Sequence, residues 1–323
     1  MKSIIYTEYG LPEKFEIKEV EKPTPQANEV LVKVVSSSVN AADWHLILGE
    51  PKFARFGFGL FKPKSNTPGI DITGIVEAVG KDVKEFKPGD EVFGDCSHRG
   101  GFAEYACADE DKIVLKPANI TFEEAGAVNV AAITALQALK KVGPIQHGQA
   151  VLINGASGGV GIFAMQIAKH LGARVTAVCS TRNIELAQSI GANHVIDYKK
   201  EDFTLNEQKY DFIIDVVGNR TVSEYKRALK PTGYCLIVGF KRLGLLMQHM
   251  VIGKMTSKKG GKRVEVMETA KPNKDDLSNL KELLESRAIK TIIDKTYPLS
   301  ESADAVRYLL TEHARAKVVV KIV

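Results

Sequence analysis

The sequence predicts an α/β protein with a β-rich first part and a second part in which strands and helices alternate. Short β-branched segments bounded by glycine, proline and aspartate occupy residues 29–35, 73–79 and 101–107. From residue 150 onward, apolar strands and amphipathic helices follow one another, which is typical of a parallel sheet with helices on both faces. The 323 residues suffice for about two such domains.

The change of character falls near Thr121. Thr121-Phe-Glu-Glu124 is a capping box that predicts the start of a helix, and residues 131–142 form a longer alanine-rich helical run. The final segment, residues 317–323, predicts a strand that returns to the first domain. Between them we expect strands at 150–154, 174–179, 194–197, 211–217 and 233–238, and helices at 162–171, 183–190 and 220–229.

Composition indicates a soluble globular protein, with 44% hydrophobic and 26% charged residues. A net charge of +5 is mild for this length, and it suits an anionic cofactor better than nucleic acid, whose binding proteins usually show denser basic clustering. No signal peptide and no long apolar run is present, so we expect no integral membrane segment. The basic segment 254–263 is interpreted as a solvated surface; contact with a membrane surface or an anionic partner is the alternative.

The four cysteines are widely spread and form no Cys-x-x-Cys pair. This spacing predicts neither a disulfide framework nor a structural zinc site, and it favours a reducing cytoplasmic location. The cysteines are Cys96, Cys107, Cys179 and Cys235.

A glycine-rich turn between an apolar strand and an amphipathic helix is the strongest functional signal. Residues 151–161 read Val-Leu-Ile-Asn-Gly-Ala-Ser-Gly-Gly-Val-Gly and lead directly into the helix 162–171. Glycines let the backbone approach a phosphate, and the helix N-terminus presents free N–H groups. We therefore expect a dinucleotide pyrophosphate to contact Gly155, Ser157, Gly158, Gly159, Val160 and Gly161.

The end of the next strand indicates which nicotinamide cofactor binds. An acid usually stands there in NAD enzymes and binds the ribose 2′-hydroxyl, whereas Cys179 stands near that position here. Ser180, Thr181 and Arg182 follow, and a hydroxyl with a guanidinium suits a 2′-phosphate. NADPH is therefore the expected cofactor, although Arg182 also fits an ordinary surface role.

Two later strands, those expected at 211–217 and 233–238, each end next to a glycine. Val217-Gly218 and Gly239-Phe240 lie where the nicotinamide half of a dinucleotide belongs, or they are plain turns.

Five motifs in order resemble the medium-chain dehydrogenase/reductase superfamily, and most closely its zinc-free quinone oxidoreductase (zeta-crystallin-like) branch. Besides the glycine turn they are Val39-Asn-Ala-Ala-Asp-Trp44, residues 68–80, Lys87-Pro-Gly-Asp-Glu-Val-Phe93 and Gly101-Phe-Ala-Glu-Tyr105. The resemblance covers essentially the whole chain. It implies a GroES-like catalytic domain formed by residues 1–122 and 292–323, a Rossmann NADP-binding domain formed by residues 123–291, and a homodimer.

The positions that hold catalytic zinc in other members of the superfamily carry unsuitable residues. Asn40 stands in place of the first cysteine, Ile70 in place of the histidine, and no cysteine occurs around Val130. The four-cysteine lobe expected near residues 95–112 is reduced to two cysteines. Zinc prefers thiolate, imidazole or carboxylate ligands, so we expect no metal. Without a Lewis acid, alcohol oxidation is disfavoured, whereas hydride delivery to an electron-poor alkene or quinone remains feasible.

Asn40 is the first candidate for the active centre, because its amide is suited to donate to a developing enolate or to the cofactor ribose; a local turn role is the alternative. Asp43 is expected to hold the backbone of the same loop. By resemblance, His45 matches a tyrosine that faces the nicotinamide and is a candidate proton donor, and Thr134 matches a threonine near the nicotinamide. Tyr198 matches a tyrosine beside the 2′-phosphate. A packed or exposed histidine and a plain helix residue are the alternatives for His45 and Thr134.

Residues 51–63, here called the phenylalanine loop, carry four phenylalanines between glycines and prolines. Such a loop either packs into the core or lines a pocket for a small lipophilic substrate. Together these observations predict a zinc-independent NADPH-dependent oxidoreductase of α,β-unsaturated carbonyls or quinones. An enoyl-thioester reductase and a non-catalytic NADPH-binding protein are the alternatives.

Overall fold

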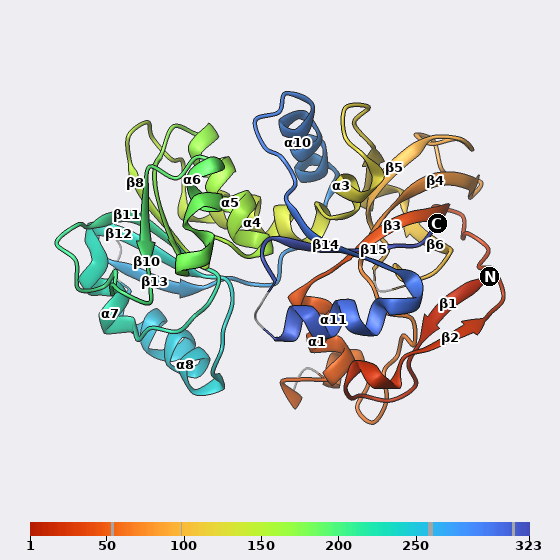
Figure 1. The fold of residues 1–323 in the computed structure, drawn as a ribbon, viewed down its shortest axis with the longest axis horizontal. Helices are drawn as coiled ribbons and strands as arrows, with labels where there is room; N and C mark the ends of the chain where they lie inside the picture. Colours follow the sequence, from red (N-terminus) through yellow and green to blue (C-terminus); the bar gives the residue numbers. More distant parts are fainter. Residues whose placement is uncertain (53–54, 98, 258–260, 312–313) are drawn as a thin grey trace. The chain divides into compact units, whose positions relative to one another are not determined.

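The computed structural model describes residues 1–52, 55–97, 99–257, 261–311 and 314–323, which form two compact units (Figure 1). The β-rich unit contains Met1–Ile133, Pro272–Arg287 and Thr291–Val323. The parallel-sheet unit contains Thr134–Lys271 and Ala288–Lys290. Residues 123–133 and 272–287 thus lie in the β-rich unit, whereas the sequence analysis assigned them to the nucleotide-binding domain.

A seven-stranded sheet organises the β-rich unit, in the order β14-β15-β3-β4-β5-β7 with β6 also paired to β3. The segments expected at 29–35 and 73–79 are parts of β3 and β4. The last strand returns as expected, because β15 runs antiparallel to β3 and places Val318 opposite Val39. The strands are β1 (Lys2–Ile5), β2 (Glu16–Glu19), β3 (Glu29–Val39), β4 (Asp71–Val79), β5 (Glu91–Asp95), β6 (Tyr105–Asp109), β7 (Ile113–Leu115), β14 (Ile293–Pro298) and β15 (Lys317–Lys321).

The strand expected at 101–107 begins only at Tyr105. Residues before it use their backbone groups elsewhere, since Phe102 N donates to Pro68 O at 3.0 Å and Glu104 N donates to Lys2 O at 3.0 Å. Gly101 also packs against backbone, where an added Cβ would lie 2.8 Å from the Gly69 carbonyl carbon. Tertiary contacts therefore override the local β-propensity of this segment.

Helices connect and flank these strands. The capping box at Thr121 is confirmed, because Glu124 N donates to Thr121 Oγ1 at 3.1 Å and Thr121 N donates to the Glu124 carboxylate at 2.8 Å. The helix expected at 131–142 begins two residues earlier. The helices are α1 (Ala41–Leu48), α2 (Arg55–Phe58), α3 (Phe122–Gly126), α4 (Asn129–Val142, shared by both units), α10 (Lys274–Glu285) and α11 (Ser302–Leu310).

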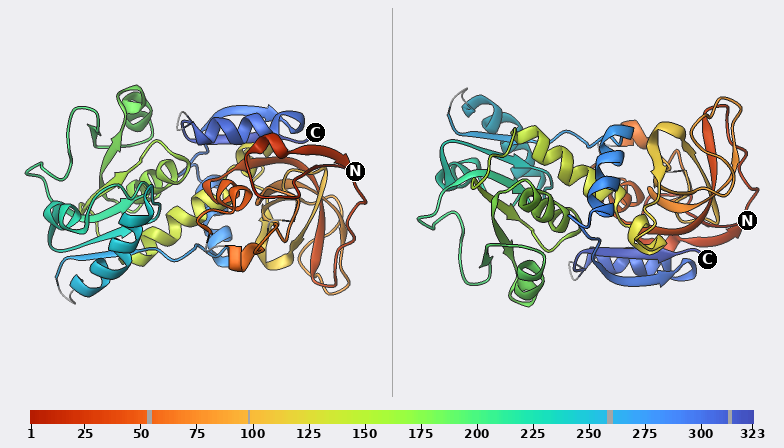
Figure 2. Two further views of the ribbon diagram at one scale, coloured as in Figure 1. Left: turned by 90° about the horizontal axis from the view of Figure 1, so that it is seen from below. Right: turned by 90° about the horizontal axis from the view of Figure 1, so that it is seen from above.

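The parallel-sheet unit contains six parallel strands in the order β10-β9-β8-β11-β12-β13. Strand order reverses between β8 and β11, which is where ligands bind in open α/β sheets. Helices α5 and α6 cover one face and α7 the other (Figures 1 and 2). The elements are β8 (Ala150–Asn154), α5 (Gly159–His170), β9 (Arg174–Cys179), α6 (Ile184–Ser189), β10 (His194–Asp197), β11 (Tyr210–Asp215), α7 (Val222–Ala228), β12 (Leu229–Ile237), α8 (Leu243–Gln248), a π-helix (His249–Gly253), α9 (Lys254–Thr256) and β13 (Arg263–Val266).

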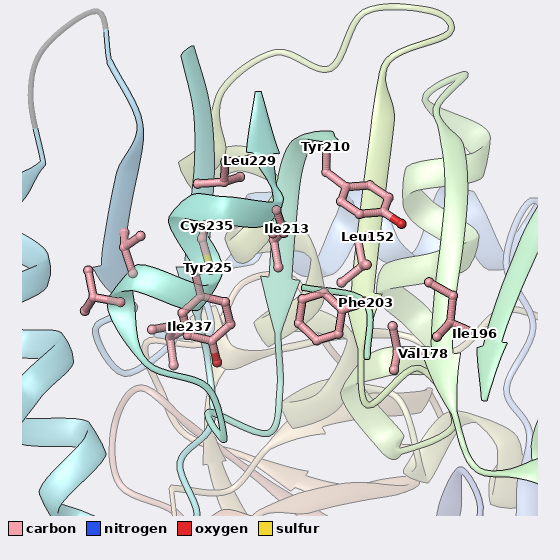
Figure 3. Close-up of a cluster of buried hydrophobic side chains, with 13 residues drawn as sticks. Leu152, Val178, Ile196, Phe203, Tyr210, Ile213, Tyr225, Leu229, Cys235 and Ile237 are labelled. Atoms are coloured by element: carbon pink, nitrogen blue, oxygen red, sulfur yellow. The ribbon is translucent and has the colours of Figure 1, made fainter. Parts of the chain in front are cut away.

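The core beneath α7 fixes the position of the strand ends. Figure 3 shows Tyr225 of α7 in one cluster with side chains from neighbouring strands, including Ile213 of β11 and Ile237 of β12. Phe203 and Tyr210 fill the space toward β8. Burial of so many large apolar side chains on one face holds the sheet rigid.

Several boundaries of this unit differ from expectation: α5 begins at Gly159 rather than at 162, and β11 ends at Asp215 rather than at 217. The helix expected at 220–229 ends at Ala228, and β12 begins at Leu229, which pairs with Tyr210, rather than at 233. Strand β13 lies partly in the basic segment 254–263, where no strand was expected. Lys262 Nζ donates to Lys226 O at 2.6 Å, and the Arg263 guanidinium stacks 3.9 Å from the Tyr234 ring centroid. Lys258 and Lys259 lie outside the described residues.

Candidate cofactor and active site

The glycine turn has the geometry that a phosphate cradle requires. Gly155 has φ +81°, and a Cβ on Gly161 would lie 2.2 Å from Gly155 O, so both positions demand glycine. Gly158, the N-cap of α5, differs: an added Cβ would meet only Gly155 O, at 3.5 Å. The turn is therefore tight on its inner side and open at Gly158, where the backbone is accessible to an anion.

An asparagine that the sequence analysis passed over ties this turn to the end of β9. Asn183 Nδ2 donates to Ser157 Oγ at 2.8 Å and to Ser180 Oγ at 3.3 Å. Asn183 is buried, so its amide acts as a fixed bridge between two candidate phosphate-binding hydroxyls. Its only sequence signal was its position directly after the serine-threonine-arginine segment.

The residues expected at the 2′-phosphate lie on two neighbouring strand ends. Tyr198 N donates to Cys179 O at 3.1 Å, which places Tyr198 beside the end of β9, and the Tyr198 side chain is 55% exposed. Arg182 is exposed on the same edge. Thr181 differs from the expectation in one respect, because its hydroxyl donates to Asp197 Oδ2 at 2.6 Å.

Asp215, also missed, fixes the edge expected to hold the nicotinamide half. Its Oδ1 accepts from Val217 N and Gly218 N, both at 2.7 Å, while its Oδ2 accepts from Asn154 Nδ2 at 2.9 Å and from Tyr225 Oη at 2.6 Å. A buried carboxylate with four donors holds this turn rigidly.

The ends of β11 and β12 meet closely. A Cβ on Gly218 would lie 2.2 Å from Gly239 O, and one on Gly239 would lie 2.3 Å from Val216 O. The two glycine edges expected from the sequence are therefore neighbours, and Phe240 follows them half-buried.

A basic cavity of about 350 Å³ opens beside these two edges. One of its basic lining residues, Arg220, is partly neutralised, because its Nη2 lies 3.4 Å from Asp202 Oδ2. A pocket of this composition favours an anionic ligand. It is lined by Asn219, Arg220, Lys241, Arg242 and Leu245, and the sequence analysis had singled out none of them.

In the β-rich unit, Asn40 is buried and caps α1. Its backbone N donates to Asp43 Oδ2 at 2.8 Å, so Asp43 holds the loop backbone as expected. The side-chain amide is engaged on both sides: Nδ2 donates to Asp71 Oδ2 at 2.9 Å, and Oδ1 accepts from Lys317 Nζ. These contacts fix the orientation of the Asn40 amide within the unit.

Asp71 and Lys317 are the centre of this buried cluster, and both escaped the sequence analysis. Asp71 Oδ2 also accepts from Ser38 Oγ at 2.5 Å, and Oδ1 accepts from Val130 N at 2.9 Å and from Asn129 Nδ2 at 3.2 Å. The carboxylate therefore carries its charge with full hydrogen bonding, which is the condition for a buried ion to be tolerated.

Burial perturbs the ionisable groups around Asp71. It raises the pKa of Asp43 to about 7, with repulsion from Asp71 adding to the effect. Among the described residues, Asp43 Oδ1 has no hydrogen-bond partner. Burial lowers the pKa of Lys317, while attraction to Asp71 opposes that shift. The cluster thus holds a carboxyl group that titrates near neutrality.

His45 lies on α1, and its Nδ1 donates to Glu50 O at 3.0 Å. Burial lowers the pKa of the His45 imidazole, so the ring is neutral at pH 7. A neutral ring is a weaker acid than the imidazolium that a proton donor would use. Thr134, the other residue transferred by resemblance, is half-buried on α4 at the start of the parallel-sheet unit.

The phenylalanine loop is not packed into the core. Phe56 is 80% exposed and Phe61 is 88% exposed, and Phe58 and Leu60 are exposed as well. Phe53 lies outside the described residues. Of the two expectations for this loop, core packing is wrong for its described phenylalanines.

The positions matched to a zinc site carry side chains other than the thiolate, imidazole and carboxylate groups that usually bind zinc. Ile70 is buried and aliphatic, and the amide of Asn40 is held by Asp71 and Lys317. Within the described ranges, no group of three or more histidine, cysteine, aspartate or glutamate side chains is placed to hold a metal ion. In the same ranges, no helix is long and apolar enough to cross a bilayer.

Two family descriptions match the chain: "Alcohol dehydrogenase GroES-like domain" over residues 26–118 and "Zinc-binding dehydrogenase" over residues 190–320. The 2-methylene-furan-3-one reductase of Solanum lycopersicum is 33% identical over 99% of this chain and 79% of its own length. Among solved structures, the quinone oxidoreductase of Coxiella burnetii gives a TM-score of 0.88 at 30% identity, covering 100% of this chain and 99% of that one. The Escherichia coli quinone oxidoreductase complexed with NADPH gives 0.82 at 26% identity, covering both chains completely.

These likenesses extend over both units and agree with the glycine cradle and the two observed sheets. The chain belongs to the medium-chain dehydrogenase/reductase superfamily. Within that superfamily it falls in the quinone oxidoreductase, zeta-crystallin-like branch, and the expected GroES-like and Rossmann folds are confirmed.

Proposed function

We propose that this protein is an NADPH-dependent oxidoreductase that delivers hydride to an α,β-unsaturated carbonyl or a quinone without a bound metal. The observation that carries the proposal is the end of β9, where Ser180 and Arg182 follow Cys179 beside a glycine cradle and no acid occupies residues 179–182. The relatives' names support it, since one is a furanone reductase and another was solved with NADPH.

The residues present fit the cofactor. The open backbone at Gly158 suits the pyrophosphate, and Ser157, Ser180 and Arg182 suit the remaining phosphate. The basic cavity beside Gly218 and Gly239 adds positive potential along the same strand edge. When bound, the cofactor supplies the hydride; the chain's own residues bind it, orient it and stabilise developing charge.

Metal independence is part of the proposal. A buried aliphatic Ile70 and an Asn40 amide committed to Asp71 and Lys317 leave the matched positions without zinc ligands. We assign Asn40 to the active centre, where its contacts with Asp71 and Lys317 hold its amide in one orientation. His45 stays the candidate proton donor of this centre, and the hydrogen bond from its Nδ1 to Glu50 O orients the ring.

We also propose a homodimer, whose interface lies on the parallel-sheet unit at β13 and the segment next to it. Strand β13 ends the described sheet, and exposed strand edges pair readily with another chain. Next to it, the segment 243–256 exposes several large apolar side chains. Val251→Glu with Met255→Glu should shift the dimer to monomer in sedimentation velocity; an unchanged dimer would place the interface elsewhere.

All four cysteines are buried and free, which supports the proposed cytoplasmic location. The function itself is tested by following NADPH oxidation with an alkyl vinyl ketone, a quinone and an enoyl-CoA in parallel. Turnover of the ketone or the quinone is expected. Turnover of enoyl-CoA alone would assign a thioester reductase, and NADPH binding without turnover of any substrate would make the protein a non-catalytic cofactor binder.

A further inference from the structure

Within the phenylalanine loop, the described residues 55–63 expose aromatic side chains. Phe56 and Phe61 are among the most exposed apolar residues described in the chain, and Leu60 lies exposed between them. Exposed apolar groups concentrated in one short segment mark a contact surface rather than a random feature of a protein exterior.

Contacts on the inner side of the loop hold this display in place. Tyr9 Oη donates to Gly59 O at 2.6 Å, and Gly59 N donates to Arg55 O at 2.8 Å. Arg55 Nε donates to Gly49 O at 2.8 Å, and its guanidinium stacks 4.4 Å from the Tyr9 ring centroid. This segment is therefore anchored through its backbone and Arg55, while the side chains of Phe56 and Phe61 remain exposed.

The charge of the loop is one-sided. Residues 51–64 contain four basic residues and no aspartate or glutamate. Arg55 is used at the end of α1, so Lys52, Lys62 and Lys64 carry the outward charge, and all three are exposed.

We propose that residues 55–64 form a lipid-contact surface that inserts the side chains of Phe56 and Phe61 into an anionic bilayer. Aromatic side chains partition into the interface between headgroups and acyl chains, and neighbouring lysines are attracted to anionic headgroups. A second copy of the same loop is a poor occupant, because it would bring two sets of lysines together. The contact goes beyond the proposed reaction and does not depend on it.

The contact is measured by sedimentation of the intact protein with vesicles of phosphatidylcholine alone or mixed with phosphatidylglycerol. Phe56→Ser with Phe61→Ser removes the apolar part, and Lys62→Glu with Lys64→Glu reverses the charge. The matched controls are Leu205→Ser, an exposed leucine of the parallel-sheet unit, and Lys81→Glu with Lys84→Glu, two exposed lysines of the β-rich unit. NADPH oxidation with a water-soluble enone, and a melting curve, report separately on function and folding.

We expect binding to the anionic vesicles, and each lysine should raise the partition coefficient roughly fivefold. Because this attraction is electrostatic, binding should weaken as salt is added. Either loop variant should weaken the partition at least roughly tenfold, while the controls bind like the native chain. Absence of binding to anionic vesicles, equal binding to neutral vesicles, or native binding by both loop variants would overturn the proposal. Self-association that disappears in the phenylalanine variant, without vesicle binding, would assign the loop to a protein contact instead.

Discussion

Lys317 Nζ lies 3.6 Å from Asp71 Oδ2, and the two side chains are 2% and 0% exposed. Strand β15 supplies the lysine and β4 the aspartate, and the Asn40 amide touches both. A buried ammonium, an amide and a carboxylate thus form the hydrogen-bonded centre of the β-rich unit. A buried ion pair adds little net stability, but loss of one partner is costly.

Lys317→Met should therefore destabilise the protein strongly. The substitution leaves the Asp71 carboxylate buried without its cation, which costs about 3–5 kcal/mol of unfolding free energy. Urea unfolding at pH 7 measures this. Lys321→Met, in the same strand and exposed, is the control and should change stability by less than about 0.5 kcal/mol.

The double substitution Lys317→Met with Asp71→Asn separates charge from packing. Removing both charges should recover a large part of the loss, because the remaining amide keeps most hydrogen-bond partners. A double variant as unstable as the sum of the two single variants would show that the ion pair is not the cause.

Asp43 predicts a specific pH dependence of stability. Its pKa is about 7 in the folded chain and roughly 4 when unfolded, so between these values the unfolded chain releases a proton that the folded chain keeps. The unfolding free energy consequently falls as pH rises from about 4 to 7 and then levels off. Relative to the native chain, Asp43→Asn should gain about 2–4 kcal/mol across this window.

Burial also raises the pKa of Asp95. Because Asp95 is present in the native chain and in Asp43→Asn alike, its contribution cancels when the two unfolding free energies are subtracted. Asp111→Asn, an exposed acid of the same unit, is the control and should follow the native profile. A pH-independent difference between Asp43→Asn and the native chain would contradict the assigned titration.

Substitution by alanine should affect stability at one glycine of the cofactor turn and NADPH affinity at another. Gly161→Ala forces a Cβ to within 2.2 Å of Gly155 O, so it should destabilise the fold by about 1–3 kcal/mol. Gly158→Ala meets only one atom, at 3.5 Å, and should fold normally while weakening NADPH, because the methyl occupies the open side. Thermal melting and cofactor titration measure both. Native NADPH affinity in Gly158→Ala would place the phosphate elsewhere.

Arg182 should determine the preference for NADPH over NADH. Arg182→Ala should weaken NADPH roughly 10- to 100-fold, the worth of a hydrogen bond to a charged group, and leave NADH nearly unchanged. Fluorescence titration with both cofactors measures this. Arg174→Ala, at the opposite end of β9, is the control. Equal losses for the two cofactors would refute contact with the 2′-phosphate.

Local signals in the sequence were sufficient to predict the tight glycine turn after β8 and the capping box before α3. Gly155, Gly161 and the capping residues Thr121 and Glu124 act through neighbours a few residues away, and their geometry appeared as expected. Lys317 had no such signal. It reaches Asn40 across 277 residues of sequence, and only the pairing of β15 with β3 brings the two together.

Other misses have the same origin. Asn183 and Asp215 act through hydrogen bonds between different strand ends, which composition and periodicity do not reveal. The exposure of the phenylalanine loop depends on Tyr9 and Arg55, which hold the loop backbone from behind. Apolar residues alone predicted a buried segment or a pocket, because the sequence does not show which way a loop faces.

Transfer of deuteride from NADPH labelled at C4 to an enone, after exhaustive chelation, tests the central claim most directly. The account predicts deuterium on the β-carbon of the product, an unchanged rate after chelation, and no stoichiometric metal by elemental analysis. Activity that disappears on chelation and returns with zinc, or a product without deuterium at the β-carbon, would contradict it.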